Sequence, residues 1–532
     1  MSTEFLNEEK REKSMARGAF SLAASVLLVK IIGFIYKVPL SHILGDEGMG
    51  YFNSAYTIFS FFYMLCSGGV PRAVSIMVTK AHTRDEECDA NIILSVALKF
   101  FAAVGLIFTA IFLLFSPLLA DVIGNSLATM SLICIAPSLT FVAASGVLKG
   151  FLNGKEKLGS IAVAEVIDSC IKFIVGLSFA LLAARLGYDA PMISAFTIVG
   201  VTLGAFVGSL FLYISAKIDI SKEKARQKYK NTTSAKGIIK GIFKISVPIT
   251  ISSAIMGISN IVDLGMIIKR LVSSGVSAER AVSLYGNFTT LAVPMLNLVM
   301  AIITPLSTAA LPHLTKAHVL NDRSGFSDFT ERVLKICASL SLPLTFAFVF
   351  YSKEILVLLF DDVSAETAAP LLTLLAPSVF FMSMLTVTNT VLESSLHTKA
   401  PLIAMSVGSV FKFVVSYILI ANQEIGICGA PIGTSIYYSV SFLISSMLMF
   451  IFSGVRASSL VSLWRPLTAS FLSVFISKIV YNLMCQKGNP NICFLICAII
   501  SAVIYVILFC VFMQKEAKKI LYFVKINKKQ SV

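Results

Sequence analysis

The chain has 532 residues, of which 56% are hydrophobic and 14% are charged, and its formal net charge is +15. A soluble domain carries about 25% charged residues, so this composition excludes an ordinary soluble enzyme or binding module. Apolar runs of about 20 residues recur along the whole sequence, each long enough to cross a hydrocarbon core about 30 Å thick. A backbone in lipid must satisfy its own hydrogen bonds, so the chain is predicted to be an all-α polytopic membrane protein.

The apolar runs predict about fourteen spans of roughly 20 residues or more, joined by segments too short to hold a soluble domain. In chain order the predicted spans are 18–40, 51–79, 90–115, 118–147, 159–184, 190–216, 244–268, 283–311, 333–352, 367–392, 400–421, 428–452, 463–484 and 491–513. The ten cysteines lie mostly inside these runs and are interpreted as small buried apolar side chains rather than as a disulfide framework.

Basic residues cluster in three places: the N-terminal segment, the stretch 217–243 and the C-terminal tail. Positive loops stay on the cytoplasmic side, and all three places fall on one side if the chain crosses the membrane fourteen times. The N- and C-termini are therefore predicted to be cytoplasmic. The positive charge is explained by topology and by contact with anionic membrane lipids, and no nucleic-acid partner is expected because no nucleic-acid fold signal accompanies it.

The sequence repeats itself weakly but in register. The tetrapeptide at 79–82 recurs at 315–318, an offset of 236 that also relates Gly50 to Gly286 and Phe52 to Phe288, and the tripeptide at 136–138 recurs at 376–378. The pattern predicts two parallel six-helix lobes, an arrangement typical of transporters that bind substrate between repeats. The predicted divisions are an N-lobe (1–216), a basic cytoplasmic linker (217–243), a C-lobe (244–455), and helices 13 and 14 with a basic cytoplasmic tail (456–532).

Charged residues inside the spans are candidates for function, because each costs about 2.5–3.5 kcal/mol to place in the bilayer core on insertion scales. Surplus cations in a cavity would attract an anion, and Lys and Arg are suited to phosphate. The candidate substrate-binding cations are Lys30, Lys37, Arg72, Lys172 and Lys412, and the candidate coupling or ion-pairing acids are Glu165, Asp168, Asp263 and Glu393.

Simpler interpretations of several of these charges remain open. Asp168 and Lys172 are spaced to form a local i,i+4 ion pair, and Lys37 and Glu393 are near enough to span ends to reach an interface. No nucleotide-binding Gly-Lys-Ser/Thr loop and no metal-site spacing occurs in the sequence, so neither a catalytic nor a metal site is predicted.

The N-terminal motifs Lys30–Phe34, Leu44–Gly48 and Gly68–Ser75 resemble the polysaccharide-biosynthesis branch of the multidrug/oligosaccharidyl-lipid/polysaccharide (MOP) exporter superfamily. Within that branch they are most similar to the stage V sporulation protein B group of Gram-positive bacteria, relatives of the MurJ-type lipid II flippases. The resemblance implies a flippase of the bacterial plasma membrane. Its substrate would be an undecaprenyl-pyrophosphate-linked saccharide, such as the peptidoglycan precursor lipid II for cell wall or spore cortex, moved by alternating access.

The resemblance also implies a cationic central cavity with a basic residue of the first helix at the place of Lys30, and a lipid-tail groove formed by helices 13 and 14. Some relatives couple transport to sodium through acids of the second lobe. Asp263 fits that role, whereas the eleventh helix carries Lys412 instead of an acid. A sodium or proton gradient, or the membrane potential, is the expected driving force, with no bound cofactor. The expected partners are the lipid-linked oligosaccharide, membrane lipids and cell-wall synthesis enzymes.

Three alternatives stay open from the sequence: a MATE-like drug or cation antiporter, a membrane-embedded glycan-assembly enzyme, and a scaffold without transport. A cation antiporter would favour an acidic or aromatic cavity, and here the charge surplus inside the spans is basic. An enzyme would need catalytic carboxylates in an outer loop, and the predicted outer loops are short. A scaffold would leave the cations inside the spans without an explanation.

Overall fold

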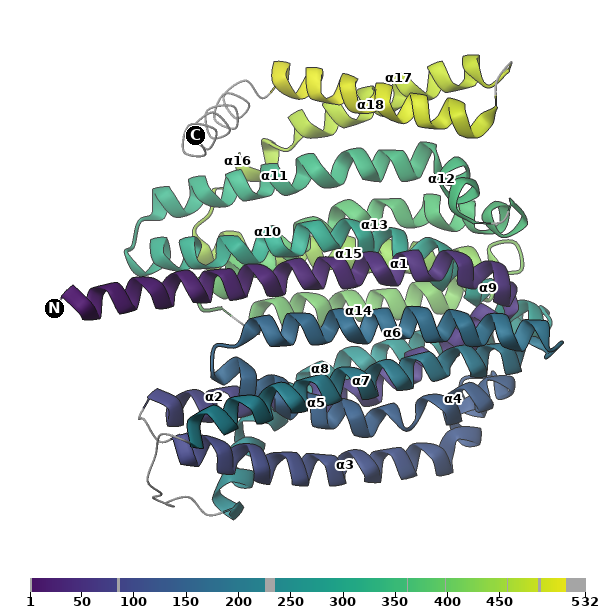
Figure 1. Cartoon of the computed structure of the whole chain (residues 1–532). Coiled ribbons are helices and arrows are strands. Elements are labelled where there is room, and N and C mark those ends of the chain that lie inside the picture. Colours follow the sequence, from purple (N-terminus) through teal and green to yellow (C-terminus); the bar gives the residue numbers. More distant parts are fainter. Residues whose placement is uncertain are drawn as a thin grey trace. The chain divides into compact units, whose positions relative to one another are not determined.

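A computed structural model describes residues 2–83, 87–224, 235–360, 362–397, 399–456, 458–486 and 489–512. Every regular element in these ranges is a helix, which confirms the predicted all-α membrane class (Figure 1). The chain forms two compact units, unit 1 (Met1–Thr290) and unit 2 (Leu291–Val532). Residues 225–234 of the predicted linker, Asp361, Lys487 and the tail from 513 onward lie outside the described residues.

The helices of unit 1 are α1 (Ser2–Ser67), α2 (Val70–Thr83), α3 (Glu87–Val122), η1 (Ser126–Ala128), α4 (Thr129–Ile135), α5 (Ser138–Gly154), α6 (Leu158–Arg185), α7 (Ala190–Lys224), α8 (Ala235–Ser273) and α9 (Ala278–Asn287). A π-helical turn, η2 (Phe288–Ala292), carries the chain from one unit into the other. The helices of unit 2 are α10 (Val293–Val319), α11 (Arg323–Phe350), α12 (Ser352–Leu359), α13 (Asp362–Ser394), α14 (Lys399–Ile420), η3 (Gly426–Cys428), α15 (Gly429–Ser453), α16 (Ser458–Val461), α17 (Trp464–Met484) and α18 (Pro490–Phe512).

By length and composition, 11 helices of the described chain can cross a membrane, or 12 if the bent pair α4–α5 is one span. The predicted count of fourteen is therefore not confirmed. One of the 11, Ala24–Ala81, contains the predicted span 51–79 and most of the predicted span 18–40. The predicted span 244–268 lies in α8, which is not among the 11. The last two predicted spans match α17 and α18 to within one residue.

Two glycine-dependent breaks divide the N-terminal helical stretch. Gly45 has φ 64° and ψ −179°, which lies outside the helical region and interrupts α1. The predicted span 51–79 is not one continuous helix, because α1 ends at Ser67 and α2 starts at Val70. At that break the Gly69 N–H donates to Thr250 Oγ1 of α8 at 3.1 Å, and a Cβ on Gly69 would collide with the Ser246 carbonyl oxygen.

The predicted span 118–147 also starts in the wrong place. Pro117 lies inside α3, which continues to Val122, and the chain reverses at Gly124 with φ 75°. The Asn125 N–H then donates to the Ala120 carbonyl at 2.9 Å, which is how a left-handed glycine ends a helix. The span that follows is α4–α5, bent by 43°.

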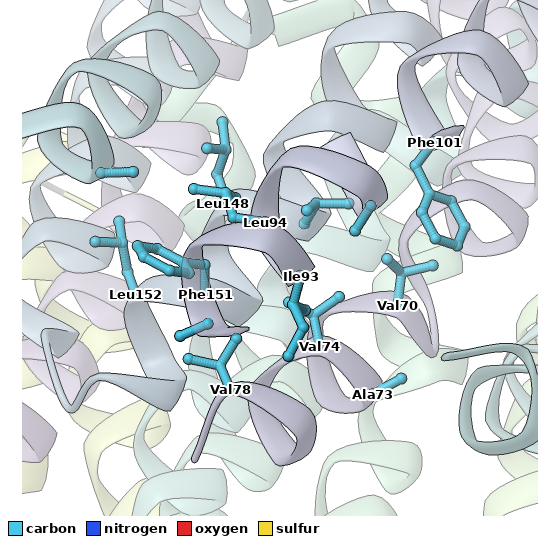
Figure 2. Packing of buried hydrophobic residues seen from close by; sticks show 14 of the residues in the cluster. Val70, Ala73, Val74, Val78, Ile93, Leu94, Phe101, Leu148, Phe151 and Leu152 are labelled. Carbon is cyan, nitrogen blue, oxygen red and sulfur yellow. The ribbon is translucent and has the colours of Figure 1, made fainter. Parts of the chain in front are cut away.

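The core of unit 1 gathers side chains from α2, α3 and α5, with contributions from α6, α7 and α8. Figure 2 shows Val74 and Val78 of α2 facing Ile93 of α3, with Phe151 and Leu152 of α5 close by. On α2 the residues Val70, Val74 and Val78 recur every fourth position, so one face of this short helix is buried against its neighbours. This packing holds the start of α2, and Arg72 with it, in a defined position.

The duplication leaves a backbone signature. Glu156 after α5 and Leu396 after α13 have left-handed φ angles of 59° and 64°, although neither is glycine. The two positions are separated by 240 residues, the same offset that relates the tripeptides at 136–138 and 376–378. Such a conformation is uncommon outside glycine, so its recurrence at matched positions supports the repeat found in the sequence.

Candidate functional site

Lys30 and Lys37 share a helical face by spacing, yet their surroundings in α1 differ. The Lys30 side chain is exposed, and within the described ranges it makes no hydrogen bond or ion pair. Lys37 is half-buried and its Nζ donates to the Thr289 carbonyl oxygen at 3.0 Å. The difference arises because α9 and η2 contact α1 near Lys37. Lys30 therefore remains available to a ligand, whereas Lys37 already has a neutral acceptor.

Several polar contacts hold α1 to α9 and η2, and we call this region the α1–α9 junction. Asn287 Nδ2 donates to Asp46 Oδ2 at 2.9 Å, and Asn53 Nδ2 donates to Thr290 Oγ1 at 2.7 Å. Together with the Lys37–Thr289 bond, these contacts fix the π-helical turn against both segments of α1. The residues of the junction are Lys37, Asp46, Gly50, Asn53, Gly286, Asn287, Thr289 and Thr290.

Two glycines make the junction possible, and they are the repeat counterparts found in the sequence. A Cβ on Gly50 would collide with the Val282 carbonyl oxygen, and a Cβ on Gly286 would collide with the Asp46 carbonyl oxygen. Val282 follows Asp46 by the same 236 positions that separate the two glycines. Each contact is thus the symmetry mate of the other, as in an isologous interface.

Arg72 lies in the first turn of α2, and its side chain is exposed. It has no ion pair or hydrogen bond to any residue that the structure describes. Pro71 is suited to the start of this helix, because the missing N–H of proline is one that the first turn leaves unpaired in any case. Arg72 and Lys30 are thus the two candidate cations of unit 1 without a protein partner.

Lys172 belongs to a charge cluster whose charges balance. Lys172 Nζ lies 3.9 Å from Asp168 Oδ2 on α6, so the local ion pair considered from the sequence does form. Lys149 of α5, which is not among the predicted site residues, lies 3.5 Å from Glu165 Oε1. With two cations and two carboxylates this cluster has no surplus charge. Lys149 was missed because the predicted span ended at residue 147, although Glu165 without a local cation was a usable signal.

The cluster depends on close contact between α6 and α7. Gly200, Gly204 and Gly208 recur every fourth residue of α7 and face α6, the small-residue pattern that lets membrane helices approach closely. An ideal Cβ on Gly204 would lie 2.6 Å from Asp168 Oδ1 and 2.7 Å from the Asp168 carbonyl oxygen. No side chain fits there unless the helices separate or Asp168 moves.

Replacing Gly204 by leucine is expected to destabilise the folded protein by about 1–3 kcal/mol, the usual cost of overpacking. Gly159 is the matched control, because an ideal Cβ there meets no atom within 4 Å, so Gly159→Ala should leave stability unchanged or slightly raised. The measurement is the thermal unfolding midpoint in detergent. Equal midpoints for Gly204→Leu and the wild type would show that α6 and α7 do not depend on this approach.

The remaining acidic candidate of unit 1, Asp263 on α8, is half-buried. It is close enough to Tyr285 of α9 to interact electrostatically, and the Tyr285 hydroxyl lies 3.3 Å from Thr57 Oγ1. In unit 2, Lys412 on α14 is half-buried and Glu393 near the end of α13 is exposed, and neither is free of interactions. Substrate-binding or coupling roles for all three stay predictions.

A further charge inside a span, Lys478 on α17, was not selected from the sequence. Its Nζ lies 2.6 Å from Glu354 Oε1 and sits over the rings of Tyr351 and Tyr481, at 4.6 and 4.9 Å from the ring centroids. Both side chains of the ion pair are mostly buried. The Tyr351 hydroxyl also lies 2.8 Å from Ser477 Oγ, so these contacts attach α17 to the Tyr351–Glu354 segment.

Glu354→Ala is expected to lower stability by about 1–3 kcal/mol, because it leaves the Lys478 ammonium between two rings without its carboxylate. The double variant Glu354→Gln/Lys478→Met removes both charges and should recover most of that loss. Unfolding midpoints of the single and double variants in the same detergent test this. If the double variant is as unstable as the single one, the ion pair itself contributes stability that uncharged side chains cannot supply.

Comparison with known proteins identifies relatives along most of the chain. The family model "Polysaccharide biosynthesis protein" matches residues 15–318, and the MatE model matches residues 248–418. Stage V sporulation protein B of Bacillus subtilis (strain 168) is 23% identical over 423 residues, covering 79% of this chain and 80% of the relative. Lipid II flippase MurJ of the same organism is 21% identical over 446 residues, covering 81% of each chain.

The fold matches a solved structure of the lipid II flippase MurJ in an inward closed conformation. The TM-score is 0.72 at 18% identity, and the match covers 93% of this chain and 99% of that one. The chain therefore has the MurJ/MATE-type fold, as the sequence resemblance predicted. MurJ is named a flippase and the matching MATE structure a transporter, in agreement with the expectation of a transporter rather than an enzyme.

Proposed function

Since the chain belongs to the polysaccharide biosynthesis protein family, whose model covers more than half of it, we propose that it is a flippase for an undecaprenyl-pyrophosphate-linked saccharide. It moves this lipid across the bacterial plasma membrane by alternating access. The saccharide carried is a peptidoglycan precursor such as lipid II, used for cell wall or spore cortex.

The observation that carries the proposal is the pair of unmatched cations in unit 1. Lys30 and Arg72 are exposed, and no described carboxylate neutralises them. Two other lysines inside spans of this unit, Lys149 and Lys172, each have a carboxylate within 4 Å, and Lys37 donates to a backbone carbonyl. A cation costs free energy in a membrane unless it meets an anion, and a pyrophosphate headgroup supplies two phosphates to meet these two side chains.

The charge balance also sorts the acidic candidates. Glu165 and Asp168 are paired with lysines, so in the proposal neither binds a coupling ion: Glu165 holds α6 to α5 through Lys149, and Asp168 pairs with Lys172 within α6. Asp263 remains the coupling acid of the proposal, with a sodium or proton gradient or the membrane potential as the driving force. Among the described residues no group of three or more His, Cys, Asp or Glu side chains forms a metal site.

A MATE-like drug or cation antiporter is the second candidate, supported by the MatE match over residues 248–418. The two candidates differ in the sign of the charge that they bind. Two unmatched cations repel a cationic drug and attract a pyrophosphate, so the local electrostatics favour the flippase.

The decisive experiment uses the wild-type protein in proteoliposomes with fluorescent lipid II or ethidium. The proposal expects lipid II to reach the opposite leaflet faster than in protein-free vesicles, and expects ethidium transport to stay at the protein-free rate. Undecaprenyl pyrophosphate should compete with lipid II, whereas undecaprenol should not. Ethidium transport without lipid II translocation would replace the flippase by the antiporter.

A further inference from the structure

The π-helical turn of the α1–α9 junction includes one backbone carbonyl, that of Thr289, whose i+5 partner has no N–H. In a π turn the carbonyl of residue i pairs with the N–H of residue i+5. For Thr289 that residue is Pro294, which has no N–H. Lys37 Nζ supplies the missing donor at 3.0 Å. A lysine side chain from α1 therefore completes the backbone hydrogen bonding of η2, in a segment where an unpaired carbonyl is costly.

The Lys37 ammonium is held by a neutral group, and this makes the bond replaceable. No carboxylate of the described chain lies within ion-pair distance of Lys37, so its charge is not neutralised. An ammonium has three N–H donors, and the carbonyl uses one of them. The other two can meet an anion before Thr289 is released. The bond to the Thr289 carbonyl has one charged partner, the ammonium, whereas a bond to phosphate joins two opposite charges, so an arriving phosphate competes well with the carbonyl.

The turn also occupies a special place in the chain. The division between the two compact units falls between Thr290 and Leu291, inside η2. On the α1 side the turn is held by the Asn53–Thr290 bond and by the symmetric glycine contact of Gly50 and Gly286. α10 starts at Val293, directly after the last residue of η2.

We propose that Lys37 is a headgroup-sensitive latch: it pins η2 through the Thr289 carbonyl, and a pyrophosphate group draws it away and frees the turn to rearrange. The inference rests on the proposed function for the nature of the ligand. It assigns Lys37 a positioning role distinct from that of Lys30, which lies on the same helix and has no bond to η2. The ligand chemistry is a pyrophosphate, either on a polyprenyl lipid or free in solution.

Hydrogen–deuterium exchange of the amides of residues 288–296 tests the latch in the full-length protein. Without ligand, Lys37→Met should exchange at least about 10-fold faster than the wild type in this segment, since a hydrogen bond to a charged group contributes about 1.5–3 kcal/mol. Lys30→Met is the matched control and should exchange at the wild-type rate. Lys37→Arg keeps the charge and should remain protected.

Adding ligand tests whether a pyrophosphate draws Lys37 away from the Thr289 carbonyl. Undecaprenyl pyrophosphate should speed exchange of 288–296 in the wild type and in Lys37→Arg, and should cause no further change in Lys37→Met. Inorganic pyrophosphate should act in the same way if the anion alone suffices; an effect of the lipid only would assign the latch to the membrane-bound ligand. Undecaprenol should have no effect.

The outcomes separate the latch from the proposed function. Binding of undecaprenyl pyrophosphate is measured independently by native mass spectrometry. Wild-type protein that binds the lipid but shows unchanged exchange at 288–296 would overturn the latch and leave the flippase proposal standing. Protein that does not bind undecaprenyl pyrophosphate would overturn both the flippase proposal and the displacement of Lys37 by a pyrophosphate. If Lys37→Met does not fold, the wild-type and Lys37→Arg responses decide the question.

Discussion

Lys30→Gln and Arg72→Gln are each expected to slow lipid II translocation by about 10- to 100-fold. In the proposed complex each substitution removes one charge-assisted hydrogen bond to the headgroup, and such bonds contribute about 1.5–3 kcal/mol. Because neither side chain has a protein partner in the described structure, its loss leaves no buried carboxylate unpaired. The yield and unfolding midpoint should therefore match those of the wild type.

One control for this prediction keeps the positive charge at position 72, and the other removes a positive charge from a different helix. Arg72→Lys should retain part of the rate, since the charge remains while the planar fork is lost. Lys217→Gln removes one exposed charge near the C-terminal end of α7 and should leave the translocation rate unchanged. Translocation at the wild-type rate by the double variant Lys30→Gln/Arg72→Gln would remove the main support for the proposed function.

The second large effect concerns stability. Asp219 of α7 is 4% exposed; Lys155 Nζ lies 3.5 Å from one of its carboxylate oxygens, and Lys157 forms an ion pair with the other. Asp219→Ala leaves a buried Lys155 without its carboxylate, and breaking a buried pair in this way costs about 3–5 kcal/mol. We expect the variant to accumulate poorly and to unfold at a much lower temperature in detergent.

The exposed pair of Asp328 and Arg456 gives the comparison for Asp219. Its atoms lie 3.7 Å apart and both side chains are more than half exposed. Asp328→Ala should change stability by less than about 1 kcal/mol, since exposed ion pairs contribute little. If Asp219→Ala is no worse than Asp328→Ala, the buried cluster does not stabilise the end of α7.

Long apolar helices were predictable because the bilayer requires about 20 apolar residues for each crossing. The ends of α17 and α18 follow directly from the apolar runs at 463–484 and 491–513. The helix ends near Pro117 and Gly124 were harder, because proline is tolerated inside a membrane helix while a left-handed glycine ends it. Both residues occur in the sequence, and the residue pattern does not predict which of them ends the helix.

The candidate site was predictable in its residue types and only partly in its pairings. Lys172 has an acid four residues before it, so its ion pair with Asp168 could be expected from the sequence. Lys30 and Lys37 are equivalent in sequence, and only the fold shows that Lys37 donates to a backbone carbonyl and Lys30 does not. The Lys37 contact joins residues 252 positions apart. Its acceptor is a backbone carbonyl, which every residue has, so the sequence does not indicate which residue accepts the bond.

The glycine contact at the α1–α9 junction has a consequence for the origin of the molecule. Each glycine packs against the carbonyl four residues before the other glycine: Gly50 against Val282, and Gly286 against Asp46. Gly50 and Gly286 occupy matching positions of the two sequence repeats. A surface that fits its own counterpart also fits a second copy of itself. Duplication of a gene whose one-repeat product dimerised through this glycine would produce the pair of reciprocal contacts seen here.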